Sequence, residues 1–377
     1  MVIDACGAGE LPDSADYGDA GANTLGHVAE AAGGLDLPVL TSLGLGNIMP
    51  LPGAPPADHP VVHGRLHPLG PGKDTITGHW ELMGVITPVA LRTYPDGFPD
   101  DVIDALRDAT GRGVLCNRPY SGTEVIEDFG EEHMRTGALI VYTSADSVLQ
   151  IAAHVDVVPP AELYAACAAA REIMTGEHAV GRVIARPFRG IPGAFQRTEG
   201  RRDMALDPPD RSYLQELQAD GVPVHTVGKI GQVFNSVGVD EQHKGSTNAA
   251  AIAATGELIR GLDGGLVFTN LVETDQVFGH RNDVPGFHGA LQGIDTAVGE
   301  WLDHLDPARD LLVITADHGC DPTHPGTDHT REHAPLLARF AGDGGRRHDG
   351  AFADIGASVL RWLSGRDADL PGDPFLG

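Results

Sequence analysis

The chain has 377 residues, and its 53 acidic against 26 basic side chains give a formal net charge of −27. This negative charge disfavours binding to nucleic-acid phosphates and to anionic membranes, and no apolar run approaches the roughly 18 residues that span a bilayer. The length is sufficient for one large α/β domain with a smaller domain inserted in it.

The chain start and the cysteines favour a cytoplasmic protein without a disulfide framework. Asp4 stands where a signal peptide would carry a basic and then an apolar segment. The spacing of Cys6, Cys116, Cys167 and Cys320 is typical of neither disulfides nor zinc ribbons. Cys6 and Cys320 flank candidate metal ligands, but small buried thiols are the favoured interpretation of both.

Residues 1–9, M-V-I-D-A-C-G-A-G, predict a strand followed by a glycine-rich turn. A G-x-G turn at this place also occurs in nucleotide-binding domains, but the residues that follow form a loop, and a single G-x-G is weak support. The competing interpretation makes Asp4 a metal ligand at the end of the first strand. Only three residues precede Asp4, which suggests a true start further upstream.

Apolar spacing, cap residues and Gly/Pro breaks predict the remaining elements. The expected helices cover residues 24–32, 100–109, 161–174, 211–218, 245–260, 288–304 and 354–362. The expected strands cover residues 138–143, 180–185, 222–227, 266–271 and 311–315. A short element at 38–45 is followed by an expected Pro/Gly-rich loop up to residue 70. The alternation predicts an α/β fold, with a core formed by residues 1–87 and 208–377 and an inserted α+β domain at 88–207.

Residues 72–84, G-K-D-T-I-T-G-H-W-E-L-M-G, place Thr75 beside Lys73 and Asp74 at the start of an expected helix. A threonine nucleophile needs activation by a base or by a metal ion. Threonine before a helix is also a common N-cap. This stretch alone leaves both interpretations open.

Six arginines gather between residues 181 and 202 of an otherwise acidic chain: Arg182, Arg186, Arg189, Arg197, Arg201 and Arg202. Arginine forks bind phosphate oxygens well, so a phosphosugar contact is one interpretation. Solvated surface arginines are the more common case.

Two expected strands are each followed by an aspartate and a histidine. Asp275 and His280 follow residues 266–271, and Asp317 and His318 follow residues 311–315. Carboxylate with imidazole suits Zn²⁺ or Mn²⁺, and the carboxyl ends of parallel strands are where α/β sheets bind ligands. His329 lies beyond a Pro/Gly-rich loop that can turn back. The alternative is a solvated loop that happens to be rich in His and Asp.

Taken together, these stretches resemble the phosphopentomutase (phosphodeoxyribomutase) family of the alkaline phosphatase superfamily. The resemblance rests on residues 72–84, the Asp275 to His280 pair and residues 315–332, T-A-D-H-G-C-D-P-T-H-P-G-T-D-H-T-R-E. Further family motifs follow in the same order at residues 12–19, 142–154, 180–188, 225–231 and 352–357. The resemblance implies an alkaline-phosphatase-like core with an inserted cap domain.

The resemblance also implies two divalent metal ions of the Mn²⁺ type. One ion is expected on Asp275, His280 and His329, and the other on Asp4, Asp317 and His318. Thr75 is expected to touch the ion on Asp4, Asp317 and His318 and to become phosphorylated. Two such ions roughly 3.5 to 4 Å apart suit in-line phosphoryl transfer, because they stabilise both the attacking and the leaving oxygen.

The implied reaction interconverts ribose 1-phosphate, or its 2-deoxy form, with the 5-phosphate in nucleoside catabolism. It passes through a sugar bisphosphate, which also serves as activator. Expected substrate contacts are Ser144, Asp146, Arg182 and Arg186 from the cap and Lys229 from the core. A turn or helix cap is an equally good interpretation of Ser144 and Asp146.

The sequence departs from the family pattern at one further position, and several alternative functions stay open. Thr274 stands between Glu273 and Asp275 where the family usually has phenylalanine between two aspartates, which affects the surroundings of the ligand rather than the ligand itself. The alternatives are a metal-dependent phosphoglycerate mutase, a phosphatase on the same fold and a catalytically silent metal-binding or sugar-binding protein. Metal-dependent phosphoglycerate mutases usually have a serine in an N-S-x-x-G-H context. The sequence leaves the preferred sugar, the metal in the cell and the oligomeric state open.

Overall fold

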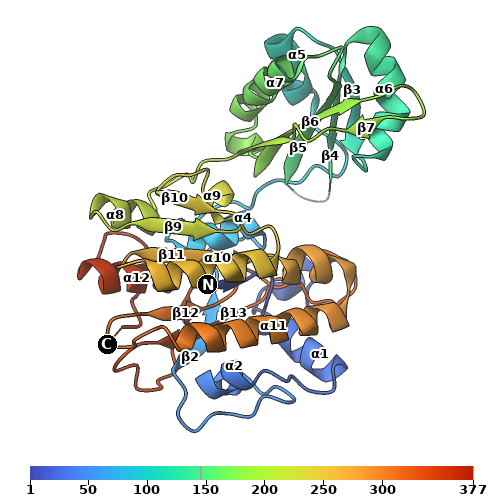
Figure 1. Cartoon of the computed structure of the whole chain (residues 1–377). Coiled ribbons are helices and arrows are strands. Elements are labelled where there is room, and N and C mark those ends of the chain that lie inside the picture. Colours follow the sequence, from blue (N-terminus) through green and yellow to red (C-terminus); the bar gives the residue numbers. More distant parts are fainter. Residues whose placement is uncertain (145–146, 377) are drawn as a thin grey trace. The chain divides into compact units, whose positions relative to one another are not determined.

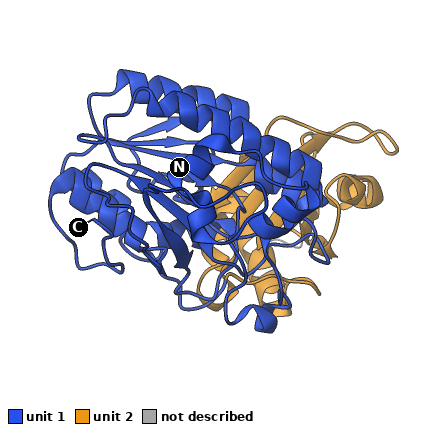
Figure 2. Ribbon diagram, turned by 90° about the horizontal axis from the view of Figure 1, so that it is seen from below, with its two compact units in different colours: residues 1–90, 208–377 blue, residues 91–207 orange. Residues whose placement is uncertain are grey.

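The computed structural model describes residues 1–144 and 147–376, and within them the chain forms two units (Figure 2). The larger unit comprises residues 1–90 and 208–377, and the smaller unit comprises residues 91–207. Each unit has a sheet of its own, so each is described by itself. None of the described helices combines the length and apolar character needed to cross a bilayer.

A mostly parallel sheet forms the centre of the larger unit (Figure 1). A parallel bridge between Val2 and Thr315 joins two runs of strands into one order. That order is β10 (Glu241–His243), β9 (Val224–Val227), β11 (Leu266–Leu271), β1 (Val2–Ile3), β12 (Leu312–Ile314), β13 (Ala334–Arg339), β2 (Val62–His67) and β14 (Gly350–Ala351). Only β13 among these described strands is antiparallel to its neighbours. The α/β class expected from the sequence is confirmed.

β1 is short, yet both of its neighbours hold it in place. The Ile3 N–H donates to the Thr315 carbonyl at 2.8 Å, and the Asp4 N–H donates to the Leu271 carbonyl at 3.2 Å. The amino group of Met1 donates to the Val313 carbonyl at 2.8 Å. β1 therefore lies between β11 and β12, which is the central position of a parallel run that is buried on both faces.

Two groups of helices pack around this sheet. The first group consists of α1 (Thr24–Ala31), α2 (Pro38–Leu43), α10 (Asn248–Gly261) and α11 (Val284–Leu302). The second group consists of α4 (Thr75–Leu82), α8 (Tyr213–Ala219), α9 (Ile230–Val233) and α12 (Asp354–Ser364). Shorter turns are α3 (Leu45–Ile48), the 3-10 helices Ser14–Tyr17 and Gly279–Arg281, and the π-helix Thr274–Phe278.

Two expectations for this unit are wrong. The expected loop up to residue 70 contains strand β2, in which histidine, arginine and glycine residues around the buried Val62 and Leu66 obscure the apolar pattern. Gly64 has to be small there, because a Cβ would lie 1.9 Å from the His348 carbonyl oxygen. The expected helix at 288–304 begins earlier, at Val284, because the Asp283 side chain caps the Gly286 N–H at 3.0 Å.

The smaller unit is an α+β unit with its own mixed sheet. Its strands are β3 (Val114–Pro119), β4 (Leu139–Thr143), β5 (Val148–His154), β6 (Arg182–Arg189) and β7 (Gln196–Arg197) in that order, with β8 (Arg202–Ala205) paired to β6. Its helices are α5 (Asp100–Thr110), α6 (Glu124–Thr136), α7 (Pro160–Ile173) and a short 3-10 turn at Gly176–His178. β3, β5, β7, β8 and α6 were not among the elements expected from the sequence.

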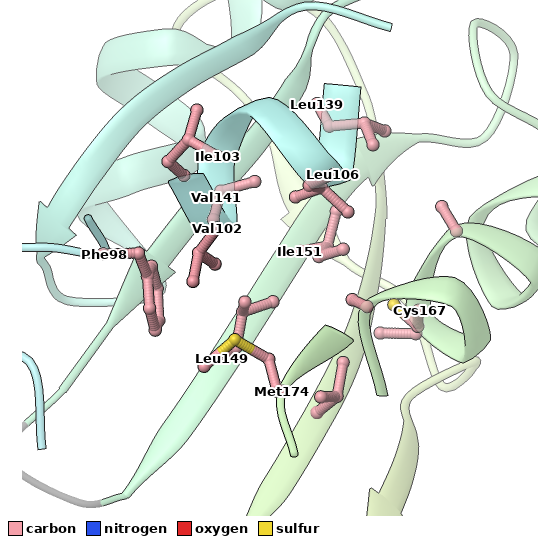
Figure 3. Packing of buried hydrophobic residues seen from close by; sticks show 14 of the residues in the cluster. Phe98, Val102, Ile103, Leu106, Leu139, Val141, Leu149, Ile151, Cys167 and Met174 are labelled. Atoms are coloured by element: carbon pink, nitrogen blue, oxygen red, sulfur yellow. The ribbon is translucent and has the colours of Figure 1, made fainter. Parts of the chain in front are cut away.

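Strand alternation gives this sheet a core on each face. Leu139 and Val141 of β4 pack with α5 and α7 in the cluster shown in Figure 3. Ile140 and Tyr142, the residues between and after them, pack instead with α6. Successive strand residues point to opposite faces, so one apolar strand supplies both cores.

Candidate active site

Four chemically active side chains follow four adjacent parallel strands of the larger unit. Asp4 follows β1, Asp275 follows β11, Asp317 follows β12 and Lys229 follows β9. The carboxyl ends of parallel strands meet at one edge of a sheet. The fold therefore gathers residues that are up to about 300 positions apart in the chain, as the bridge between Val2 and Thr315 shows.

Asp4, Asp317 and His318 form the first candidate ligand group. All three are buried, and their potential ligand atoms lie within 4.8 Å of one another. His318 Nε2 lies 3.3 Å from Asp317 Oδ2 and 3.5 Å from Asp4 Oδ1. Burial lowers the pKa of His318 to about 3, so its imidazole is neutral at ordinary pH, the form that binds metal ions.

Asp275, His280 and His329 form the second candidate group. Asp275 Oδ1 lies 3.3 Å from His280 Nε2 and 3.2 Å from His329 Nε2, and the two nitrogens are 3.2 Å apart. Ligands that share one ion through bonds of about 2.0 to 2.2 Å are themselves roughly 3.4 Å apart in tetrahedral geometry. The Thr327 carbonyl, 2.6 Å from His280 Nδ1, fixes the orientation of that ring.

Orphaned carboxylate oxygens show that the site suits a cation. Asp4 Oδ1, Asp275 Oδ1 and Asp317 Oδ2 are buried, and no hydrogen bond of good geometry reaches them in the part of the chain that the structure describes, although imidazole nitrogens lie 3.5, 3.2 and 3.0 Å away. Burying a carboxylate oxygen without a partner costs several kcal/mol or more. Divalent ions satisfy such oxygens, and mixed carboxylate and imidazole ligands suit Mn²⁺ or Zn²⁺.

The pKa values of these groups reflect the same crowding of charge. Burial, followed by the carboxylate of Asp317, raises the pKa of Asp4 well above its ordinary value, and Lys229 opposes this shift. Burial also disfavours ionisation of Asp275, but His329, Lys229 and His318 together outweigh it and hold the pKa of Asp275 below its ordinary value. A bound divalent ion would favour the ionised form of every carboxylate in the group.

Thr75 is the first residue of α4, and Asp74 caps the helix by accepting from the Ile76 and Thr77 N–H groups. Thr75 Oγ1 accepts a hydrogen bond from Lys229 Nζ at 2.9 Å and lies 3.1 Å from His318 Nε2. Lys229 also forms an ion pair with Asp4. A helix N-terminus favours negative charge, so the hydroxyl lies where a phosphoryl group would be stabilised.

His79 contacts both Thr75 and the end of β12. Its role was not predicted from the sequence. Its Nδ1 lies 2.8 Å from the Thr75 carbonyl oxygen and 3.0 Å from Asp317 Oδ2. Asn270 Nδ2 lies 3.1 Å from its Nε2. The spacing of four residues between Thr75 and His79 on an expected helix was the available signal, because such residues share a helix face.

Two further residues, missed from the sequence, hold the loops that carry the site. The buried Arg331 donates to the Gly70 and Gly72 carbonyl oxygens at 3.0 and 2.7 Å, just before Thr75. The buried Glu332 accepts from the Thr24 hydroxyl at 2.6 Å. Both belong to the T-R-E segment that follows His329, so the loop with that histidine is anchored at its end.

Cys320 is buried, as the sequence suggested, but its sulfur also faces the second group. The ligand atoms of Cys320, Asp275 and His280 lie within 4.8 Å of one another. Burial raises the pKa of this thiol far above its ordinary value. The neutral thiol is a poor ligand, so the carboxylate and imidazole groups remain the better donors.

The expected substrate contacts of the smaller unit lie on β6 and beside β4. Arg182 and Arg186 are four residues apart on β6 and therefore share a face. Arg182 Nη1 lies 3.6 Å from Asp203, and Arg186 Nε donates to Gln150 Oε1 at 3.1 Å. Ser144 follows the end of β4. Asp146 lies outside the described residues.

Arg197 and Arg201 join Arg186 near one buried hydroxyl. All three lower the pKa of Tyr142, against the larger effect of burial. The Tyr142 hydroxyl is buried and has no hydrogen-bond partner within the described ranges 1–144 and 147–376. The cluster is thus cationic with an unused donor, a combination that suits an anion. The run of arginines is evident in the sequence, but their convergence on Tyr142 depends on the pairing of β4 with β5 and β5 with β6.

Comparisons with known proteins identify the family of this chain. Residues 1–365 match the family model of the Metalloenzyme superfamily. The chain is 50% identical to a phosphopentomutase of Anaeromyxobacter dehalogenans (strain 2CP-1), over 97% of this chain and 95% of that protein. It is also 50% identical to a phosphopentomutase of Deinococcus radiodurans, over 100% and 97%.

Among solved structures, a phosphoglycerate mutase of Leishmania mexicana is similar over 99% of this chain and 96% of its own, with 15% identity and a TM-score of 0.49. The family resemblance drawn from the sequence is confirmed by the curated relatives, which match almost end to end. The chain belongs to the phosphopentomutase family, and it is an isomerase.

Proposed function

We propose that this enzyme interconverts ribose 1-phosphate, or its 2-deoxy form, with the corresponding 5-phosphate through a phosphothreonine at Thr75. The observation that carries the proposal is the position of the Thr75 hydroxyl. It lies at the start of α4, 2.9 Å from Lys229 Nζ and 3.1 Å from Nε2 of His318, a member of the first candidate ligand group. The phosphopentomutase relatives support the choice of substrate.

Two divalent ions, Mn²⁺ in our proposal, would occupy the two ligand groups. The first group is Asp4, Asp317 and His318, and the second is Asp275, His280 and His329. When bound, the ions would polarise phosphoryl oxygens and lower the pKa of the threonine hydroxyl. The buried oxygens without partners are the structural reason to place cations here.

Each turnover would comprise two phosphoryl transfers. In the first transfer the bond between phosphorus and Thr75 Oγ1 breaks, and a new bond to the free hydroxyl of the sugar monophosphate forms a bisphosphate. In the second transfer the other phosphoryl group returns to Thr75 Oγ1. Lys229, which donates to Thr75 Oγ1, is placed to stabilise the charge on that oxygen whenever it is the leaving group. A trace of sugar bisphosphate is needed to phosphorylate enzyme that has lost its phosphate.

The smaller unit would act as a cap that binds the substrate and excludes water from the phosphoenzyme, because hydrolysis would turn the mutase into a phosphatase. We assign the non-reacting phosphate and the sugar hydroxyls to Ser144, Asp146, Arg182 and Arg186, and add Arg197 and Arg201 because they share the electrostatic environment of Arg186. The proposed substrate is a small phosphosugar of the cytoplasm.

A direct assay separates this proposal from its alternatives. With Mn²⁺ and a trace of sugar bisphosphate, the enzyme is expected to convert ribose 1-phosphate to ribose 5-phosphate, to leave phosphoglycerate unchanged and to release little inorganic phosphate. Thr75→Ala is expected to abolish the conversion, whereas Thr296→Ala, an exposed threonine of α11, retains it. Conversion of phosphoglycerate, or phosphate release as the main reaction, would contradict the proposal.

A further inference from the structure

A second cluster of metal-binding side chains lies on the edge strands of the larger unit. His225 belongs to β9, and Glu241 and His243 belong to β10, the edge strand of the sheet. Glu241 pairs in register with His225, and His243 lies two residues further along the same strand. Because strand side chains alternate between faces, Glu241 and His243 share a face, and their contacts with His225 place it there too.

The distances within this cluster match those of ligands on one ion. His225 Nδ1 lies 3.2 Å from His243 Nε2, and Glu241 Oε2 lies 3.7 Å from the first nitrogen and 3.8 Å from the second. The point equidistant from these three atoms is about 2.1 Å from each, which is the usual length of a bond from Zn²⁺ to nitrogen or carboxylate oxygen.

Hydrogen bonding explains only part of this arrangement. The two imidazoles satisfy each other at 3.2 Å, but the carboxylate oxygen is too far from both nitrogens for a hydrogen bond. The Glu241 carboxylate oxygen nevertheless lies almost equally far from the two imidazole nitrogens. The His225 side chain is 8% exposed, the His243 side chain 26% and the Glu241 side chain 64%, so the cluster opens to solvent on the carboxylate side. Three ligands with one open position are typical of zinc sites that keep a water ligand.

We propose that His225, Glu241 and His243 bind a divalent transition-metal ion of the Zn²⁺ class. The site shares no residue with the two ligand groups around Thr75 and does not depend on the proposed function. Two imidazoles and one carboxylate, the same donors as in the second active-site group, suit both Mn²⁺ and Zn²⁺, and Zn²⁺ is the better probe because such donors generally bind it more tightly. The excess of acidic residues in the chain raises the local concentration of cations.

The bound ion would link β10 to β9 just before the turn that carries Lys229. The Gly228 N–H donates to the His243 carbonyl at 3.2 Å, and Lys229 is the next residue. Gly228 has a φ of 83°, a left-handed conformation that suits glycine. The ion would therefore restrain a turn whose lysine contacts Thr75, although the metal itself lies outside the candidate active site.

The proposal is tested by measuring the bound metal per chain in wild type and in matched variants. The full-length protein is dialysed against Zn²⁺, and the bound metal per chain is measured for wild type, His243→Asn and His304→Asn, an exposed histidine just after α11. Wild type and His304→Asn are expected to bind one equivalent more than His243→Asn. Equal binding by wild type and His243→Asn would overturn the proposal, and so would an equal loss in His304→Asn, because that result indicates general surface binding.

A second variant keeps the test decisive if His243→Asn folds poorly. Glu241→Gln removes one ligand from a largely exposed side chain, so packing is preserved. We expect it to weaken binding of the extra Zn²⁺ at least about tenfold, since even the outer partners of metal ligands contribute that much. An unchanged affinity in Glu241→Gln would contradict the assignment of the carboxylate.

Discussion

Lys229 is the residue on which the charge balance of the active site depends. It forms an ion pair with Asp4 and donates to Thr75 Oγ1 at 2.9 Å. Burial opposes its charge, but Asp4 raises the pKa of Lys229 above its ordinary value. Without this ammonium, the buried carboxylate of Asp4 would face other carboxylates with no fixed cation beside it.

Replacing Lys229 by methionine is therefore expected to impair both stability and catalysis. Breaking a buried ion pair by removing one partner costs about 3 kcal/mol or more, so metal-free Lys229→Met should unfold at lower urea concentration. Loss of a donor to the reacting oxygen should lower kcat about 100-fold with Mn²⁺ present. Lys244→Met, at an exposed lysine, is the control. Normal kcat in Lys229→Met would contradict the role given to this side chain.

His329 is expected to make the stability of the metal-free protein depend on pH. Burial opposes its charge, but Asp275 raises the pKa of His329 to about 9, above the ordinary value of 6.5. Because its pKa is raised in the folded state, His329 stabilises the folded protein fully below pH 6.5. This stabilisation is lost as the pH rises to about 9. Its full size is on the order of 3 kcal/mol.

The measurement is the free energy of unfolding in EDTA, for wild type and His329→Asn, between pH 6.5 and 9. The advantage of wild type is expected to shrink steadily as the pH rises across this range, because the variant cannot titrate at this position. A constant difference between the two proteins would show that the imidazole and Asp275 do not share a proton in this way.

At the scale of elements, the approach of α4 to the end of β12 sets the geometry of the site. A Cβ on Gly78 would lie 2.2 Å from the Asp317 carbonyl oxygen, a backbone atom that cannot move aside. Glycine at this position thus allows the helix that begins at Thr75 to lie against the strand end that carries Asp317. The same helix contributes His79, which contacts both residues.

Two glycine substitutions in helices should therefore have opposite effects. Gly78→Ala is expected to destabilise the protein by about 1 to 3 kcal/mol, as overpacking does, and to lower kcat by displacing Thr75. Gly289→Ala in α11 has nothing within 4 Å of the new Cβ and should be neutral or stabilising by up to about 1 kcal/mol. Urea denaturation and the mutase assay check both. Full activity in Gly78→Ala would mean that the close approach is not needed.

At the scale of elements, the sequence predicted some strands and site residues and missed others. Strands such as Leu266–Leu271 were predicted because they are short runs dominated by apolar residues, and the residues that follow them gave the candidate ligands. β2 was missed because histidine, arginine and glycine interrupt its pattern. The roles of His79 and Arg331 could not be predicted, because they depend on distances between elements far apart in the chain.

At the scale of the whole molecule, folding and metal binding should be linked. The larger unit buries three carboxylates from Asp4, Asp275 and Asp317 at the end of its central strands, and the described residues offer them few cations. Ions that bind only the folded state stabilise it by mass action, by about 2.7 kcal/mol at 100 times Kd. The smaller unit has separate cores on the two faces of its own sheet, so its stability should depend less on metal.

Removal of metal tests this linkage. EDTA is expected to abolish mutase activity and to lower the melting temperature, and added Mn²⁺ is expected to restore both. Asp275→Asn retains the shape of the side chain but removes a ligand charge, so its melting temperature should respond less to Mn²⁺. A melting temperature that is the same with EDTA and with Mn²⁺ would argue against ions at the strand ends.

The central claim is that Thr75 carries a phosphoryl group from one catalytic turnover to the next. Its most direct test is the mass of the intact protein after incubation with sugar bisphosphate and Mn²⁺, followed by peptide mapping. We predict one added phosphate, on Thr75, which exchanges with the phosphoryl group of added sugar monophosphate and is absent from Thr75→Ala. Phosphate on another residue, or full mutase activity in Thr75→Ala, would contradict the account.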